Sequence, residues 1–267
     1  MDTNLLLTDE EYQQRFAGKN HSTPYVYTLS LGEQRLVYFG VRHSRDPNDE
    51  QWEKLKSSWA DFSQHAGNPR IILLEGGGST DVKGDWADAI QQRGEVGALL
   101  LLSRDSGSEI THADPPISQE AQELAKKFES DLVAYYIFAR SAGSWLRGGT
   151  MGTFDEVLAK ATTATQRRIP GAPSDVVSYM AIHERVFGKQ LDETQKEVLI
   201  RASAPVFHDS VINDIARASG RLRDEHIVGE VERFWKDGYS IFLLFGSAHA
   251  VIQEPVLRAM IEDRTQG

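Results

Sequence analysis

Two apolar runs in the chain each end in a glycine that is followed three residues later by a histidine. Gly40 to His43 read Gly-Val-Arg-His, and Gly246 to His249 read Gly-Ser-Ala-His. A third apolar run ends at Glu75. Imidazoles and carboxylates are the groups that bind divalent cations and that move protons in acid–base catalysis. The pattern therefore indicates a site that contains His43, His249 and Glu75.

All three residues follow runs that we expect to be strands of an α/β fold. Ligands of α/β proteins bind at the carboxyl ends of parallel strands, where the loops converge. A glycine at a strand end also lets the chain turn sharply there. Simpler roles remain open, because a histidine at a strand end can bond a loop carbonyl. Glu75 could likewise cap the next helix or accept hydrogen bonds from the three glycines after it.

Four further residues could belong to the same site. His112 and Asp114 flank the end of a short expected strand, so they are candidates for substrate binding. Glu95 is another, although a carboxylate near a helix start is favourable without any function. Arg223 lies on the helix before the second histidine. It could stabilise negative charge, bind a substrate carboxylate or phosphate, or pair with Glu75.

Other catalytic motifs are missing from the chain. It has neither the His-Glu-x-x-His zinc helix, nor the Gly-x-Ser-x-Gly nucleophile elbow, nor a Gly-x-x-x-x-Gly-Lys phosphate loop. It contains no cysteine, which excludes disulfides, thiolate metal sites and cysteine nucleophiles. Any metal must therefore be held by imidazole or oxygen ligands, which suits zinc, manganese, iron, nickel or cobalt. Of these, manganese, cobalt and zinc are the cofactors that we expect.

Composition narrows the function further. The 267 residues are 40% hydrophobic and 25% charged, as in ordinary globular proteins. A net charge of −10 argues against a nucleic-acid partner. No apolar run approaches the roughly 20 residues of a membrane span, and the N-terminus lacks the basic start of a secretory signal. We expect a cytoplasmic protein that binds a small molecule or a peptide, while its oligomeric state is left open.

The order of elements predicts an α/β fold over 1–267. A single domain is expected, with a central mixed, mostly parallel sheet flanked by helices and with 143–204 as a helical insertion or lid. The expected strands are 25–31, 35–39, 70–74, 108–114 and 239–245. The expected helices carry residues 52–62, 98–102, 119–142, 174–187, 192–202, 209–236 and 254–262.

At these residues the chain resembles the TraB/PrgY and Tiki group, with erythromycin-esterase-like and ChaN-like proteins as more distant relatives. That group is marked by paired Gly-x-x-His motifs and by a glutamate that closes an early strand, here Glu75. The pair Arg223-Asp224 is similar to the group's Arg-Asp stretch before its second histidine motif. The resemblance implies a mixed α/β sheet with the motifs gathered at one edge.

The resemblance implies several activities. Tiki members resemble metalloproteases that use manganese or cobalt, erythromycin-esterase relatives are hydrolases argued to use a histidine base, and ChaN-like relatives bind haem. The leading hypothesis is a metal-assisted hydrolase of a peptide or a small ester or amide. His43 and His249 would bind the cation or orient water, and Glu75 would be a ligand or general base. The alternatives are a scaffold and a non-catalytic protein that binds a small ligand, haem or a peptide, for which 135–136 offer tyrosine ligands.

Overall fold

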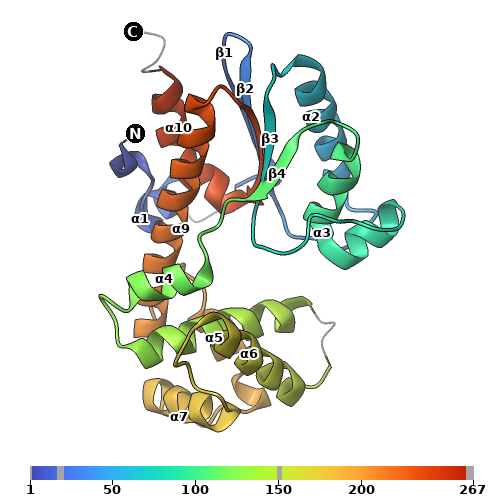
Figure 1. Cartoon of the computed structure of the whole chain (residues 1–267). Helices are drawn as coiled ribbons and strands as arrows, with labels where there is room; N and C mark the ends of the chain where they lie inside the picture. The colour runs from blue at the N-terminus through green and yellow to red at the C-terminus, as the bar shows by residue number, and fades with distance from the viewer. Residues whose placement is uncertain (1, 17–20, 149–151, 263–267) are drawn as a thin grey trace. The chain divides into compact units, whose positions relative to one another are not determined.

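This computed structural model describes residues 2–16, 21–148 and 152–262. In these residues the strands form one five-stranded sheet. Its order is β1-β2-β5-β3-β4 (Figure 1). β1 pairs antiparallel with β2, and the other neighbours are parallel. The prediction of an α/β fold with a mixed, mostly parallel sheet is therefore confirmed. The strands are β1 (Tyr25–Leu31), β2 (Gln34–Val41), β3 (Arg70–Leu74), β4 (Glu109–His112) and β5 (Ser240–Gly246).

The chain divides into two compact units. The first comprises Met1–Asp114 and Asp224–Gly267 and contains the sheet, and the second comprises Pro115–Arg223. The second unit is thus inserted into the first in sequence. The helical insertion expected at 143–204 falls within it, but the unit begins and ends further out. A lid function for this insertion stays a prediction.

Helices cover both faces of the sheet in the first unit (Figure 1). β5 explains why, because its side chains point alternately to the two faces and all are buried. Ile241, Leu243 and Phe245 pack with α9 and α10, whereas Phe242 and Leu244 pack with α2 and α3. The first unit's helices are η1 (Thr3–Leu5), α1 (Asp9–Arg15), α2 (Gln51–His65), α3 (Trp86–Ser103), the end of α9 (Val211–Lys236) and α10 (Ser247–Glu262).

The second unit is helical in its described residues. One helix was expected over 119–142, but the chain turns at 125–129 and forms two. Helix α6, which begins with a Thr153–Glu156 capping box, lies within the helical insertion expected at 143–204 but was not expected as a separate helix. The elements are α4 (Ile117–Leu124), α5 (Ser130–Gly148), α6 (Phe154–Arg168), α7 (Val176–Phe187), η2 (Glu193–Gln195), α8 (Lys196–Ala202) and the start of α9. None of the helices in the described residues has the length and apolarity to cross a bilayer.

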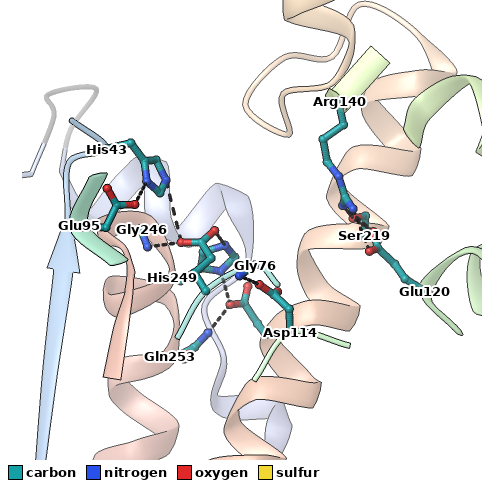
Figure 2. A network of polar contacts seen from close by, with 12 residues as sticks. His43, Gly76, Glu95, Asp114, Glu120, Arg140, Ser219, Gly246, His249 and Gln253 are labelled. Atoms are coloured by element: carbon teal, nitrogen blue, oxygen red, sulfur yellow. Dashed lines mark hydrogen bonds and ion pairs between the residues drawn. The ribbon is translucent and has the colours of Figure 1, made fainter. Parts of the chain in front are cut away.

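A buried ion pair links α4 to α5 in the second unit. The Arg140 guanidinium donates to both carboxylate oxygens of Glu120, at 2.7 and 3.1 Å (Figure 2). The Ser219 hydroxyl donates to the same carboxylate at 2.5 Å, and the Tyr136 hydroxyl donates to Ser219 at 2.8 Å. These bonds satisfy a carboxylate that is almost completely buried, which would otherwise be costly.

His183 is a second buried polar group of this unit. Its ring is fully buried, and its Nδ1 atom lies 2.6 Å from the Tyr135 hydroxyl. Its Nε2 atom is buried without a hydrogen-bond partner. Burial lowers the pKa of His183 to about 4, and the Asp192 carboxylate acts in the opposite direction. The folded chain therefore holds His183 neutral.

We expect acid to destabilise the protein through His183. The unfolded chain protonates this ring below about pH 6.5, but the folded chain does so only near pH 4. The contribution of neutral His183 to the free energy of unfolding is thus fully present above pH 6.5. It is lost as the pH falls to about 4, and the loss is at most about 3 kcal/mol. Urea unfolding of the wild type and of His183→Asn at pH 7.5, 6 and 5 measures this pH dependence of the unfolding free energy. The variant should show the smaller pH slope, and equal slopes would contradict the assignment.

Candidate functional site

The candidate residues gather where three neighbouring strands end. β5 is parallel to both β2 and β3, with Val41 opposite Gly246 and Leu74 opposite Leu244. Glu75 follows β3 directly. Its Oε2 atom lies 3.9 Å from His43 Nε2, and its Oε1 atom lies 3.9 Å from His249 Nε2 (Figure 2). The structure thus brings together the three residues that the sequence singles out.

Close packing explains the glycine of each histidine motif. A Cβ atom on Gly40 would lie 2.7 Å from the Ala250 Cβ and 2.9 Å from the Ser247 Cα, so only glycine lets α10 approach β2 this closely. A Cβ atom on Gly246 would lie 3.2 Å from His43 Nε2 and 3.4 Å from Glu75 Oε2. Gly40 therefore allows α10 to pack closely on β2, and Gly246 leaves room for the side chains of His43 and Glu75.

His43 is held by a carboxylate from α3. Its Nδ1 atom lies 2.6 Å from Glu95 Oε1, although the imidazole is 64% exposed (Figure 2). Gly94 breaks the helical geometry of α3 with a φ of +58°, and a Cβ there would lie 2.9 Å from the Ser44 carbonyl oxygen. Glu95, expected to bind substrate or to stabilise a helix start, is thus placed against His43.

His249 is held by a second carboxylate, from α9. Its Nδ1 atom lies 2.7 Å from Asp224 Oδ1, and both side chains are largely buried. The sequence predicts a loop after Gly246 and a helix from Glu254, but α10 begins at Ser247. His249 therefore lies in the first turn of a helix, which fixes its backbone more firmly than a loop would.

Glu75 lies between the two imidazoles. Its Oε2 atom accepts a 2.6 Å hydrogen bond from the Gly246 backbone amide, at the start of α10 (Figure 2). Amides at a helix N-terminus favour a negative charge nearby. The carboxylate is thus held by β5 and faced by an imidazole at each oxygen. We call His43, Glu75, Glu95, Asp224 and His249 the edge site.

The weaker candidates take other positions. His112 Nε2 lies 3.1 Å from the Gly78 carbonyl oxygen, and Asp114 Oδ2 accepts a 2.5 Å bond from the Gly76 amide. Both residues thus hold the glycine loop after Glu75, and a substrate-binding role for them stays a prediction. Arg223 is the last residue of the second unit and precedes Asp224 on α9. Its expected role in charge stabilisation also stays a prediction.

The sequence reasoning missed the groups that orient the imidazoles. Asp224 was noted only as part of a motif, and Gln253 was not noted at all. Gln253 Nε2 donates to Asp224 Oδ1 at 2.6 Å, and both residues are buried. Their signal in the sequence is a polar side chain within an otherwise apolar helix stripe, which is weak because many helices carry one.

The donor set of the edge site is of the kind that binds a divalent cation. Two imidazole Nε2 atoms and a carboxylate face one another, and each imidazole has its Nδ1 atom held by another carboxylate, as metal-binding histidines usually do. No group of three or more such residues in the described ranges already has the geometry of a metal site. The donors would have to draw closer to hold an ion.

Comparisons with models of protein families, with curated proteins and with solved structures found no match to this chain. The resemblance to the TraB and Tiki group therefore rests on the motifs and stays a prediction. Function has to be inferred from the geometry of the edge site.

Gly246→Ala should obstruct the edge site without removing any of its charges. The new methyl would contact the His43 ring and Glu75, so the rate at which diethyl pyrocarbonate modifies His43 should fall several-fold. Unfolding free energy should change by at most about 1 kcal/mol, because the His43 ring can give way. Peptide mass spectrometry measures the modification. Gly229→Ala, where a Cβ meets no atom within 4 Å, is the control. An unchanged rate in Gly246→Ala would refute the geometry.

Proposed function

We propose that this protein is a hydrolase that cleaves a peptide or a small ester or amide at the edge site. One observation carries the proposal. Two imidazoles, each oriented by its own carboxylate at Nδ1, face the two oxygens of one further carboxylate through Nε2. An imidazole whose Nδ1 atom is held by a carboxylate presents its other nitrogen to reacting groups in a fixed direction, which is typical of general bases and metal ligands.

The residues supply the proton transfers that hydrolysis requires. The oxygen of water bonds to the acyl carbon, the water gives one proton to a base, and the leaving oxygen or nitrogen takes up a proton as its bond breaks. Glu75 and His249 are the candidate bases, since both are partly shielded from solvent. His43 is the more exposed imidazole, so it is the better placed to exchange a proton with solvent or a leaving group.

A divalent cation such as manganese, cobalt or zinc would be held by His43, His249 and Glu75. When bound, such a cation activates water as a Lewis acid. Glu95 and Asp224 would keep both imidazoles turned toward it through their Nδ1 atoms. In the metal-free form of the proposal, His249 and Glu75 orient and deprotonate the water themselves.

The alternative is a protein that binds a small ligand, haem or a peptide at the same edge without cleaving it. Nothing in the geometry favours haem ligation by the two tyrosines that the sequence suggests. Tyr135 and Tyr136 are buried in the second unit, where their hydroxyls contact His183 and Ser219. A cytoplasmic location stays part of the proposal.

Glu75→Gln should reduce hydrolysis by about 100-fold or more, because it removes the charge but keeps an oxygen that can accept from Gly246. We would measure the rates at which p-nitrophenyl acetate, p-nitrophenyl butyrate and a fluorogenic peptide are hydrolysed, each in the presence of manganese, cobalt, zinc or EDTA. Glu109→Gln is the matched control, since Glu109 is an exposed carboxylate at the start of β4. Equal rates in the wild type and Glu75→Gln would remove the proposed role.

Elemental analysis separates the two forms of the hydrolase. Metal that is retained by the wild type but lost from both His43→Ala and His249→Ala supports the metal-assisted form. Turnover that resists EDTA in metal-free protein supports direct catalysis by the side chains. A haem Soret band that disappears in His43→Ala, in a protein that cleaves none of the substrates, would favour the binding alternative.

A further inference from the structure

A buried chain of hydrogen bonds runs from His249 into the core of the first unit. Asp224 Oδ1 lies 2.7 Å from His249 Nδ1 and accepts a 2.6 Å bond from Gln253 Nε2 (Figure 2). Gln253 Oε1 in turn accepts a 3.0 Å bond from the Tyr38 hydroxyl. Tyr38, Gln253 and Asp224 are at most 3% exposed. The chain therefore reaches from the edge site to the middle of β2.

Each bond of this chain has a defined direction. The side-chain amide of Gln253 has one accepting and one donating end. A hydroxyl that donates to Oε1 therefore leaves the amide nitrogen to face Asp224. Asp224 as a carboxylate only accepts, so the proton between it and His249 belongs to Nδ1. The Nε2 atom of a neutral His249 then carries a lone pair, and this is the atom that faces Glu75.

Tyr38 is suited to begin such a chain. Burial raises the pKa of Tyr38 well above its ordinary value of 10, and the charges of Asp224 and Glu75 act in the same direction. The phenol therefore keeps its proton at any working pH. Its ring packs between Tyr27 and Phe245, which restricts the direction of the hydroxyl.

We propose that Tyr38 and Gln253 are positioning residues that hold Asp224 against His249 Nδ1, and that Asp224 held in this way fixes the tautomer of His249, with the proton on Nδ1 and the lone pair on Nε2. Their catalytic meaning rests on the proposed hydrolase, but the tautomer itself can be observed without turnover. His43 differs, because it is 64% exposed and lies beside Glu95. The edge site thus combines one imidazole of fixed tautomer with one that exchanges protons with solvent.

Three variants separate this role from mere packing. Tyr38→Phe removes the hydroxyl and leaves the Gln253 amide free to turn over, which would bring its oxygen against Asp224 Oδ1 and push the carboxylate away from His249 Nδ1. Gln253→Met removes both of its hydrogen bonds at nearly constant volume. Tyr27→Phe is the matched control, since its buried hydroxyl has no hydrogen-bond partner in the described structure and its ring lies 5.3 Å from that of Tyr38.

Nitrogen-15 NMR of the imidazole side chains reads the tautomer directly, with the His249 signals assigned by their loss in His249→Gln. We expect the Nδ1–H form in the wild type and in Tyr27→Phe, and a mixture of Nδ1–H and Nε2–H forms in Tyr38→Phe and Gln253→Met. An unmixed Nδ1–H form in Tyr38→Phe, or the same mixture in Tyr27→Phe, would overturn the proposal. Tyr38→Phe loses a single oxygen, so the test survives if Gln253→Met does not fold.

Hydrolysis provides the second measurement. kcat should fall about tenfold in Tyr38→Phe with KM little changed, because the substrate contacts remain. The effects of Tyr38→Phe and Gln253→Met should not add in the double variant, since one acts through the other. Additive losses would overturn the proposal. If the wild type cleaves no substrate, the proposed function fails, but the NMR result still decides the tautomer.

Discussion

β5 lies between β2 and β3 and runs parallel to both, and this pairing creates the edge site. Parallel neighbours end at the same edge of a sheet, so residues some two hundred positions apart come within reach of one carboxylate. The Gly246 amide reinforces the arrangement by bonding Glu75 across the strand boundary. Loss of the β5 pairing would separate His43, Glu75 and His249 at once.

The edge site concentrates three carboxylates, and each one is matched by a hydrogen-bond donor. Glu95 lies against His43, Asp224 accepts from Gln253 and lies against His249, and Glu75 accepts from a backbone amide. Negative groups with little access to water are tolerated only when they are bonded in this way. The same bonds orient the imidazoles, so stability and positioning depend on the same contacts.

The sequence predicted the class of fold and the convergence of the three strand ends. Hydrophobic runs define strands, and the glycine-histidine spacing marks their ends, so both features are local signals. The partners of the imidazoles were not predictable in this way. Asp224 reaches His249 from α9, and Gln253 of α10 bonds Asp224, so both contacts depend on how the two helices pack. The turn that aims Glu95 at His43 depends on one left-handed glycine, Gly94.

The helix boundaries were also only partly predictable from the local sequence. α10 was expected to begin at Glu254, but it starts at Ser247, because nothing in the local pattern marks the end of β5 as a helix start. The capping box at Thr153 and Glu156 was a readable signal for α6 that the hydrophobic pattern obscured. The break at 125–129 has no glycine or proline, so a continuous helix was the natural reading of that stretch.

The contact at Gly40 has a consequence for how this scaffold could diversify. Backbone and side-chain atoms of β2 and α10 touch there with no room for a methyl group, so steric exclusion sets the height of the helix above the strand. The contact thereby fixes His249 of α10 relative to β2, the strand that His43 follows. The irregular segment 77–84 follows Glu75 without carrying any edge-site residue. Substitutions in that segment would therefore leave the residues of the edge site in place.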